Sequence, residues 1–201
     1  MAKITDLSQL DPDGYYSYAD YLTWSLDQAV ELIRGKIVAM SPAPTSDHQS
    51  ISRNLLLSIG NYLHKKPYKV FHAPFDVRLY DRKKSLVANR EIHSVVQPDL
   101  SVICDTAKID AQGCLGAPGW VIEILSRGNS KKEMQIKYDL YQENGVKEYW
   151  LVYPYEQAVY QFVLDDAGEK YQLFKMYSGE DVAAAYLFPD CRVDLQEVFT
   201  E

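Results

Sequence analysis

Two carboxylates near the middle of the chain lie in short apolar segments, where acidic residues are uncommon. Asp99 belongs to residues 97–102, and Glu123 lies inside residues 119–125. Both segments have the composition of β-strands, in which Asp and Glu are depleted and seldom buried without a partner. If the strands are neighbours, the two side chains converge, and carboxylate oxygens are the ligands that Mg²⁺ prefers. We therefore expect a divalent metal site that includes Asp99 and Glu123.

A lysine occupies an unexpected position in the helix predicted after the Glu123 segment. The capping-box sequence 130–133 begins this helix, and Asn144 and Gly145 mark its end. With about 100° of rotation per residue, Lys137 falls within the apolar arc of the helix. That arc consists of Met134, Ile136, Tyr138, Leu140 and Tyr141. Either the stem of Lys137 lies on the apolar surface with its ammonium in water, or the ammonium points at the carboxylates.

Length and composition are those of one globular domain. The chain has 201 residues, of which 47% are hydrophobic, and no Pro-, Gly- or Ser-rich linker divides it. We expect residues 1–201 to form a single domain. The amino terminus is polar and no apolar run reaches the ~18–20 residues of a membrane span, so we expect a cytoplasmic protein without a membrane partner. The three cysteines match no zinc-site spacing and are expected to be reduced.

The charge is unevenly distributed along the chain. The net charge is −7, yet residues 64–84 contain seven basic residues and only two acidic ones. A net acidic protein is a poor match for nucleic acid, whereas a local basic segment can follow a phosphate backbone. The same segment also fits a hairpin tip kept in water by its lysines, and both interpretations stay open.

The order of the predicted elements favours a mixed sheet flanked by helices. Two helices are expected before the Lys137 helix, at residues 15–24 and from the capping-box sequence 46–49 to residue 66. Strand patterns precede and follow the Lys137 helix. The predicted strands are 30–33 and 36–40 around an Arg34–Gly35 turn, 70–71, 75–80, 100–104, 120–125, 148–153, 158–164, 171–177 and 193–199.

These residues resemble the PD-(D/E)xK nuclease superfamily, and more closely its bacterial restriction-endonuclease branch of unknown biological role. Pro98 and Asp99 match the PD pair, and Glu123, 24 positions after Asp99, matches the acid of (D/E)xK. The similarity extends over nearly the whole chain, including residues 31–37, 42–49, 77–79 and 145–154. It implies an α/β restriction-endonuclease-like fold with a central mixed β-sheet flanked by helices.

The third position of the motif departs from the superfamily pattern. Leu125 stands where the motif has lysine, and a leucine can neither donate a hydrogen bond nor orient water. In this branch the lysine is expected in the following helix, which matches Lys137. Arg127, Lys131 and Lys132 are nearby substitutes.

The resemblance implies metal-dependent hydrolysis of phosphodiester bonds in DNA. Asp99 and Glu123 are expected to be catalytic and to hold Mg²⁺, for which Mn²⁺ substitutes. The backbone carbonyl of Ile124 and the carboxylate of Glu31 are expected to complete the metal shell. Lys137 is then the third catalytic residue, because its ammonium orients the attacking water or stabilises developing negative charge.

Several alternatives stay open on the sequence alone. Glu31 lies on what looks like an edge strand and can face solvent, and His48, an accessory candidate for the site, can be a surface or capping residue. The protein can also be an inactive nuclease-fold module for DNA binding or assembly, or hydrolyse another phosphodiester. A homodimer is expected because nucleases that cut both strands commonly pair two sites.

Overall fold

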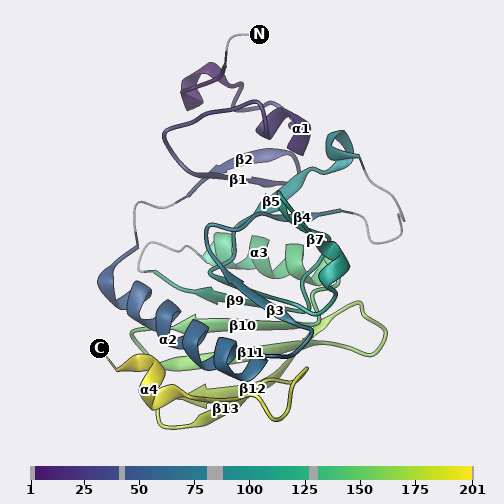
Figure 1. Cartoon of the computed structure of the whole chain (residues 1–201). Helices are drawn as coiled ribbons and strands as arrows, with labels where there is room; N and C mark the ends of the chain where they lie inside the picture. The colour runs from purple at the N-terminus through teal and green to yellow at the C-terminus, as the bar shows by residue number, and fades with distance from the viewer. Residues whose placement is uncertain (1–2, 41–43, 81–87, 127–130, 201) are drawn as a thin grey trace.

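Two six-stranded mixed sheets and a small hairpin form the framework of the protein (Figure 1). The computed structural model describes residues 3–40, 44–80, 88–126 and 131–200. The first sheet has the order β2 (Lys36–Ala39), β1 (Val30–Ile33), β5 (Ser94–Val96), β4 (Val77–Leu79), β8 (Gly113–Leu115) and β7 (Ile109–Asp110). The second has the order β12 (Tyr171–Ser178), β11 (Ala158–Leu164), β10 (Glu148–Tyr153), β9 (Trp120–Ile124), β6 (Leu100–Ile103) and β3 (Lys69–His72). The hairpin consists of β13 (Val182–Ala184) and β14 (Arg192–Asp194).

Helices cover both faces of the second sheet. On one face lie α2 (Ser46–Leu63) and α4 (Leu195–Phe199), and on the other lies α3 (Lys131–Asn144), which Figure 1 shows between the two sheets. The remaining helical segments are α1 (Tyr18–Tyr21) and the 3₁₀ turns η1 (Leu7–Gln9), η2 (Asn89–Glu91) and η3 (Thr106–Lys108). This mixed α/β arrangement confirms the predicted fold class. Among the described residues, no helix has the length and apolar character needed to cross a membrane.

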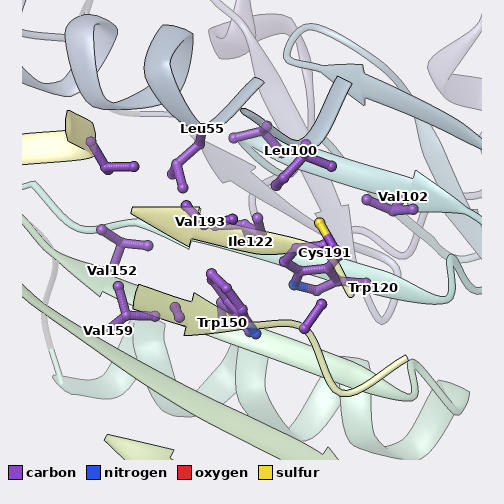
Figure 2. Packing of buried hydrophobic residues seen from close by; sticks show 14 of the residues in the cluster. Leu55, Leu100, Val102, Trp120, Ile122, Trp150, Val152, Val159, Cys191 and Val193 are labelled. Carbon is purple, nitrogen blue, oxygen red and sulfur yellow. The ribbon is translucent and has the colours of Figure 1, made fainter. Parts of the chain in front are cut away.

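The packing of α2 follows directly from its sequence. Thr45 is the N-cap, and its hydroxyl accepts a hydrogen bond from the backbone N–H of His48. Ile51, Leu55 and Ile59 recur every four residues, so they share one face, and all three are buried. That face packs on the second sheet at Leu100 and Ile122 and on the hairpin at Val193, as Figure 2 shows around Leu55. In the same core, the rings of Trp120 and Trp150 lie 4.7 Å apart between centroids.

The alternation of β9 divides its side chains between the two faces of the sheet. Trp120, Ile122 and Ile124 belong to the α2 core, whereas Val121 packs in the α3 core. Glu123 follows the same alternation, so its carboxylate points toward α3. The parallel pairing of β9 with β10 through α3 places Glu123 opposite Leu151, and this crossover brings Lys137 over the carboxylate.

Three details of the predicted elements need correction. Residues 193–199 are not one strand, because Asp194 accepts a hydrogen bond from Gln196 N–H and caps α4 after β14. The cap of α2 is Thr45 and not Ser46. The first sheet was not predicted as a separate layer, and its strands β5, β7 and β8 were missed, as was β13 of the hairpin. The expected cap of α3 at Ser130 lies outside the described residues.

Candidate active site

The ammonium of Lys137 lies between two buried carboxylates. Its Nζ atom is 3.0 Å from Oε1 of Glu123 and 3.1 Å from Oε1 of Glu31. Glu123 comes from β9 in the second sheet, Glu31 from β1 in the first, and Lys137 from the helix between them. Tyr141, one turn after Lys137, donates its hydroxyl to Glu123 Oε1. Of the two interpretations of Lys137, the structure shows the ammonium aimed at the carboxylates.

Glu31 is held at the site by the backbone just before Asp99. The N–H of Gln97 donates to Glu31 Oε1 at 2.8 Å, and the Gln97 amide donates to Asp76 Oδ1 at 2.8 Å. Glu31 is only 3% exposed, because β1 lies between β2 and β5 and is not an edge strand. The alternative of a solvent-facing Glu31 is therefore wrong.

Asp99 lies at the start of β6 with donors on both carboxylate oxygens. Oδ2 accepts a hydrogen bond from Ile124 N–H at 2.7 Å, which ties Asp99 to the end of β9. Oδ1 lies 3.3 Å from Nε2 of His48, in the first turn of α2. The His48 side chain is 13% exposed, so it lies at the site and not on the open surface.

The chain is similar to a known protein family and to a solved structure. A family model described as "Uma2: Putative restriction endonuclease" matches residues 18–196. The chain belongs to the Uma2 family. Among solved structures, it is similar to a protein described as a putative nuclease belonging to DUF820 from Anabaena variabilis, with a TM-score of 0.67. That similarity covers 92% of this chain and 97% of the other at 19% identity, which establishes the shared fold. No curated protein matches the chain.

Membership of the Uma2 family confirms the resemblance to the PD-(D/E)xK superfamily. The structure shows where each site residue predicted from the sequence lies. Glu31, Asp99, Glu123 and Lys137 come together with the Ile124 backbone, and His48 joins them. Leu125 packs at the edge of the α3 core. Of the substitutes for Lys137, Lys131 and Lys132 are exposed in the first turn of α3, and Arg127 lies outside the described residues.

Two residues that contact carboxylates of the candidate active site were not predicted from the sequence. Tyr141 was assigned to the apolar arc, yet its position four residues after Lys137 places it on the same helix face. Gln97 acts through its backbone N–H, which every residue except proline carries. The four-residue spacing from Lys137 was sufficient to predict the position of Tyr141, whereas no pattern of side chains predicts a backbone contact such as that of Gln97.

The pKa of Glu123 is raised by its burial and by the neighbouring acids. Burial raises it most, and the charges of Asp99 and Glu31 raise it further, against the opposing effect of Lys137; the result is a pKa of about 7. The charges of Glu123 and Glu31 raise the pKa of Lys137 despite its burial, so the lysine stays charged. Burial lowers the pKa of His48, but the hydrogen bond and charge of Asp99 outweigh it and the net direction is upward.

The donor atoms suit a hard divalent cation. Glu31 and Glu123 bind Lys137 through Oε1, and no described residue donates a hydrogen bond to Oε2 of either acid. Carboxylate and carbonyl oxygens are the preferred ligands of Mg²⁺ and Mn²⁺. Within the described ranges, however, no group of three or more His, Cys, Asp or Glu side chains is arranged as a metal site.

Metal binding at this site is expected to strengthen as pH rises. The metal and the proton compete for Glu123, so Mg²⁺ or Mn²⁺ should raise the melting temperature more at pH 8 than at pH 6, on either side of the pKa of about 7. Differential scanning fluorimetry at millimolar metal measures both shifts. Glu123→Gln should remove the pH dependence. Equal shifts at both pH values, or none at either, would count against metal binding by Glu123.

Proposed function

We propose that this Uma2 protein is a metal-dependent endonuclease that hydrolyses phosphodiester bonds of DNA. The observation that carries the proposal is the convergence of Glu31, Glu123 and Lys137 from two sheets and a helix, next to Asp99. A partly exposed ammonium with two carboxylate partners has a chemical use in phosphoryl transfer, where negative charge develops on oxygen. The family description as a restriction endonuclease supports the same reaction.

In this proposal the acids hold the cation and the lysine acts on the substrate. Asp99 and Glu123, with Glu31 and the Ile124 carbonyl, would hold Mg²⁺ or Mn²⁺. A bound divalent cation supplies an activated water and offsets charge on the phosphate. Lys137 orients the attacking water or donates to a phosphate oxygen, because its ammonium carries three donors and keeps its proton.

The contacts around these residues fix their orientation. Tyr141 holds one oxygen of Glu123, and the Gln97 N–H holds one oxygen of Glu31. His48 contacts Asp99 from α2 and is an accessory residue that positions this carboxylate. Glu31 and Glu123 thus each have one oxygen bound to protein and keep the second oxygen for a ligand, whereas both oxygens of Asp99 have protein partners.

A second candidate function is DNA binding or assembly without cleavage. Leu125 at the third motif position favours it. So does the pairing of Lys137 with both glutamates, since an ammonium that neutralises the acids takes the place of a cation. The acting form of either candidate is proposed to be a homodimer, since a two-fold axis pairs equivalent sites on the two strands of a duplex.

Incubation with supercoiled plasmid and with a single-stranded oligonucleotide separates these functions. The enzyme is expected to nick or cleave DNA with Mg²⁺ or Mn²⁺ and to stop when EDTA removes the metal. Gel electrophoresis measures cleavage, and a mobility-shift gel without metal measures binding. Binding without cleavage at any metal concentration would support the inactive module. Neither binding nor cleavage would overturn both functions and leave a different phosphodiester as the substrate.

A further inference from the structure

A hollow next to the candidate active site has no role in the proposed chemistry. Its volume is about 150 Å³, and it lies between the first turns of α2, the turn from β10 to β11, and α4. The side chains used in the argument below are Asp47, Ser50, Ile51, Tyr155, Gln157 and Phe199.

Two of the segments that line the hollow are continuous with residues next to the candidate active site. Asp47 immediately precedes His48, whose Nε2 lies 3.3 Å from Asp99. Pro154, also in the lining, follows β10, in which Val152 pairs with Ile124. With about 4.8 Å between strands and about 3.3 Å per residue, Pro154 lies roughly 8 Å from Ile124. A strand rises by about 3.4 Å per nucleotide along a duplex axis and by more when it is extended, so roughly 8 Å corresponds to one or two nucleotides.

The lining fits a planar uncharged ring better than a phosphate. Ile51, Tyr155 and Phe199 supply apolar and aromatic surface, and Tyr155 is 49% exposed. Asp47, Ser50 and Gln157 supply hydrogen-bonding groups, and no Lys, Arg or His belongs to the described lining. A cavity of about 150 Å³ in another protein holds benzene, so this volume accepts a single six-membered ring.

We propose that the hollow binds one pyrimidine base of the substrate strand, one or two nucleotides from the cleaved phosphate. This inference rests on the proposed nuclease function. The base stacks on Tyr155, as bases do on exposed aromatic side chains in proteins that bind single strands. The carboxylate of Asp47 accepts from an exocyclic amine, the pairing by which acidic side chains read cytosine. The Gln157 amide donates to a ring carbonyl.

The backbone of Gln157 bears on the expected effect of replacing this residue. Its φ angle is +46°, in the left-handed region that glycine adopts far more readily than glutamine. Non-glycine residues in this region cost stability and are found at ligand sites. A glycine would suit the turn better, so Gln157→Gly should relieve backbone strain, which fixes the expected sign of its effect on stability.

Fluorescence anisotropy with labelled single-stranded oligonucleotides of cytidylate, thymidylate and adenylate tests the inference, with Ca²⁺ in place of Mg²⁺ to limit cleavage. The wild type is expected to bind the cytidylate strand about tenfold more tightly than adenylate, with thymidylate between them because thymine has no exocyclic amine for Asp47. Tyr155→Ala should weaken pyrimidine binding about tenfold, a typical loss for one stacked base. Gln157→Gly should raise the melting temperature while reducing the preference for pyrimidine, a combination that a purely structural role would not give.

The matched control is Tyr186→Ala, because Tyr186 is 45% exposed but does not line the hollow. It should bind all three strands like the wild type. Equal binding of the three strands by the wild type, with no change in Tyr155→Ala, would overturn the base pocket and leave the nuclease function standing if plasmid is still cleaved. Failure to bind any strand or to cleave plasmid would overturn both.

Discussion

Glu123→Gln and Lys137→Ala are each expected to reduce metal-dependent cleavage at least about 100-fold. The first substitution removes the negative charge that binds the cation, and the second removes the ammonium that stabilises charge on the phosphate. Loss of a single stabilising donor in an active site typically costs 10²–10³ in rate. Initial rates of plasmid nicking at saturating Mn²⁺ measure both effects.

Matched variants separate chemistry from folding and from total charge. Glu169→Gln and Lys170→Ala change the same residue types in an exposed turn, and both should cleave at the wild-type rate. Lys137→Ala leaves Glu31 and Glu123 without their shared ammonium, so its melting temperature is measured with and without metal to confirm that it folds. Full activity of Lys137→Ala together with loss in Lys131→Ala or Lys132→Ala would transfer the catalytic role to the start of α3.

The strongest sequence patterns predicted the parts of the fold that surround the site. The apolar run around Glu123 is a buried strand, because β9 is covered on both faces. The helical period placed Lys137 on the inward face of α3, and its ammonium does contact the carboxylate. Both predictions depend on local periodicity, which a single sequence contains.

The missed parts depend on contacts between distant segments. β5 and β8 have three residues each, too few for a period to be recognised. β1 becomes an interior strand only because Leu32 pairs with Val95, more than sixty positions later, so the burial of Glu31 could not be seen from its own surroundings. The apolar side chains of residues 195–199 are compatible with a strand or a helix. The helix forms because the Asp194 side chain caps its N-terminus.

Among the substitutions predicted for this protein, replacement of Glu148, an acid outside the candidate active site, is expected to have the largest effect on the stability of the fold. Glu148, at the start of β10, is fully buried, and its carboxylate accepts four hydrogen bonds. Oε1 accepts from Trp150 Nε1 and Gln161 Nε2 at 2.7 Å and from Tyr186 N–H at 2.9 Å, and Oε2 accepts from Leu187 N–H at 2.9 Å. One carboxylate thus joins the second sheet to the segment that leads from β13 to β14.

Glu148→Gln is expected to lower the free energy of unfolding by about 2–4 kcal/mol. An amide has one acceptor oxygen, so its NH₂ must face at least one of the four donors and leave it unsatisfied in the core. Urea denaturation followed by circular dichroism measures the loss. The control is Glu143→Gln, which removes the exposed ion pair of Glu143 with Arg34 and should cost no more than about 1 kcal/mol.

The pH dependence of the free energy of unfolding tests whether the Glu148 carboxylate causes the loss in Glu148→Gln. Burial raises the pKa of Glu148, against the lowering effect of its four hydrogen bonds, so the folded protein holds this proton more tightly than the unfolded chain does. The contribution of Glu148 to stability therefore falls as pH rises from the unfolded pKa through the higher folded pKa. Glu148→Gln cannot titrate and should lack this decline. A variant as stable as Glu143→Gln at every pH would show that the amide satisfies the four donors, and that the charge of Glu148 does not hold this segment to the sheet.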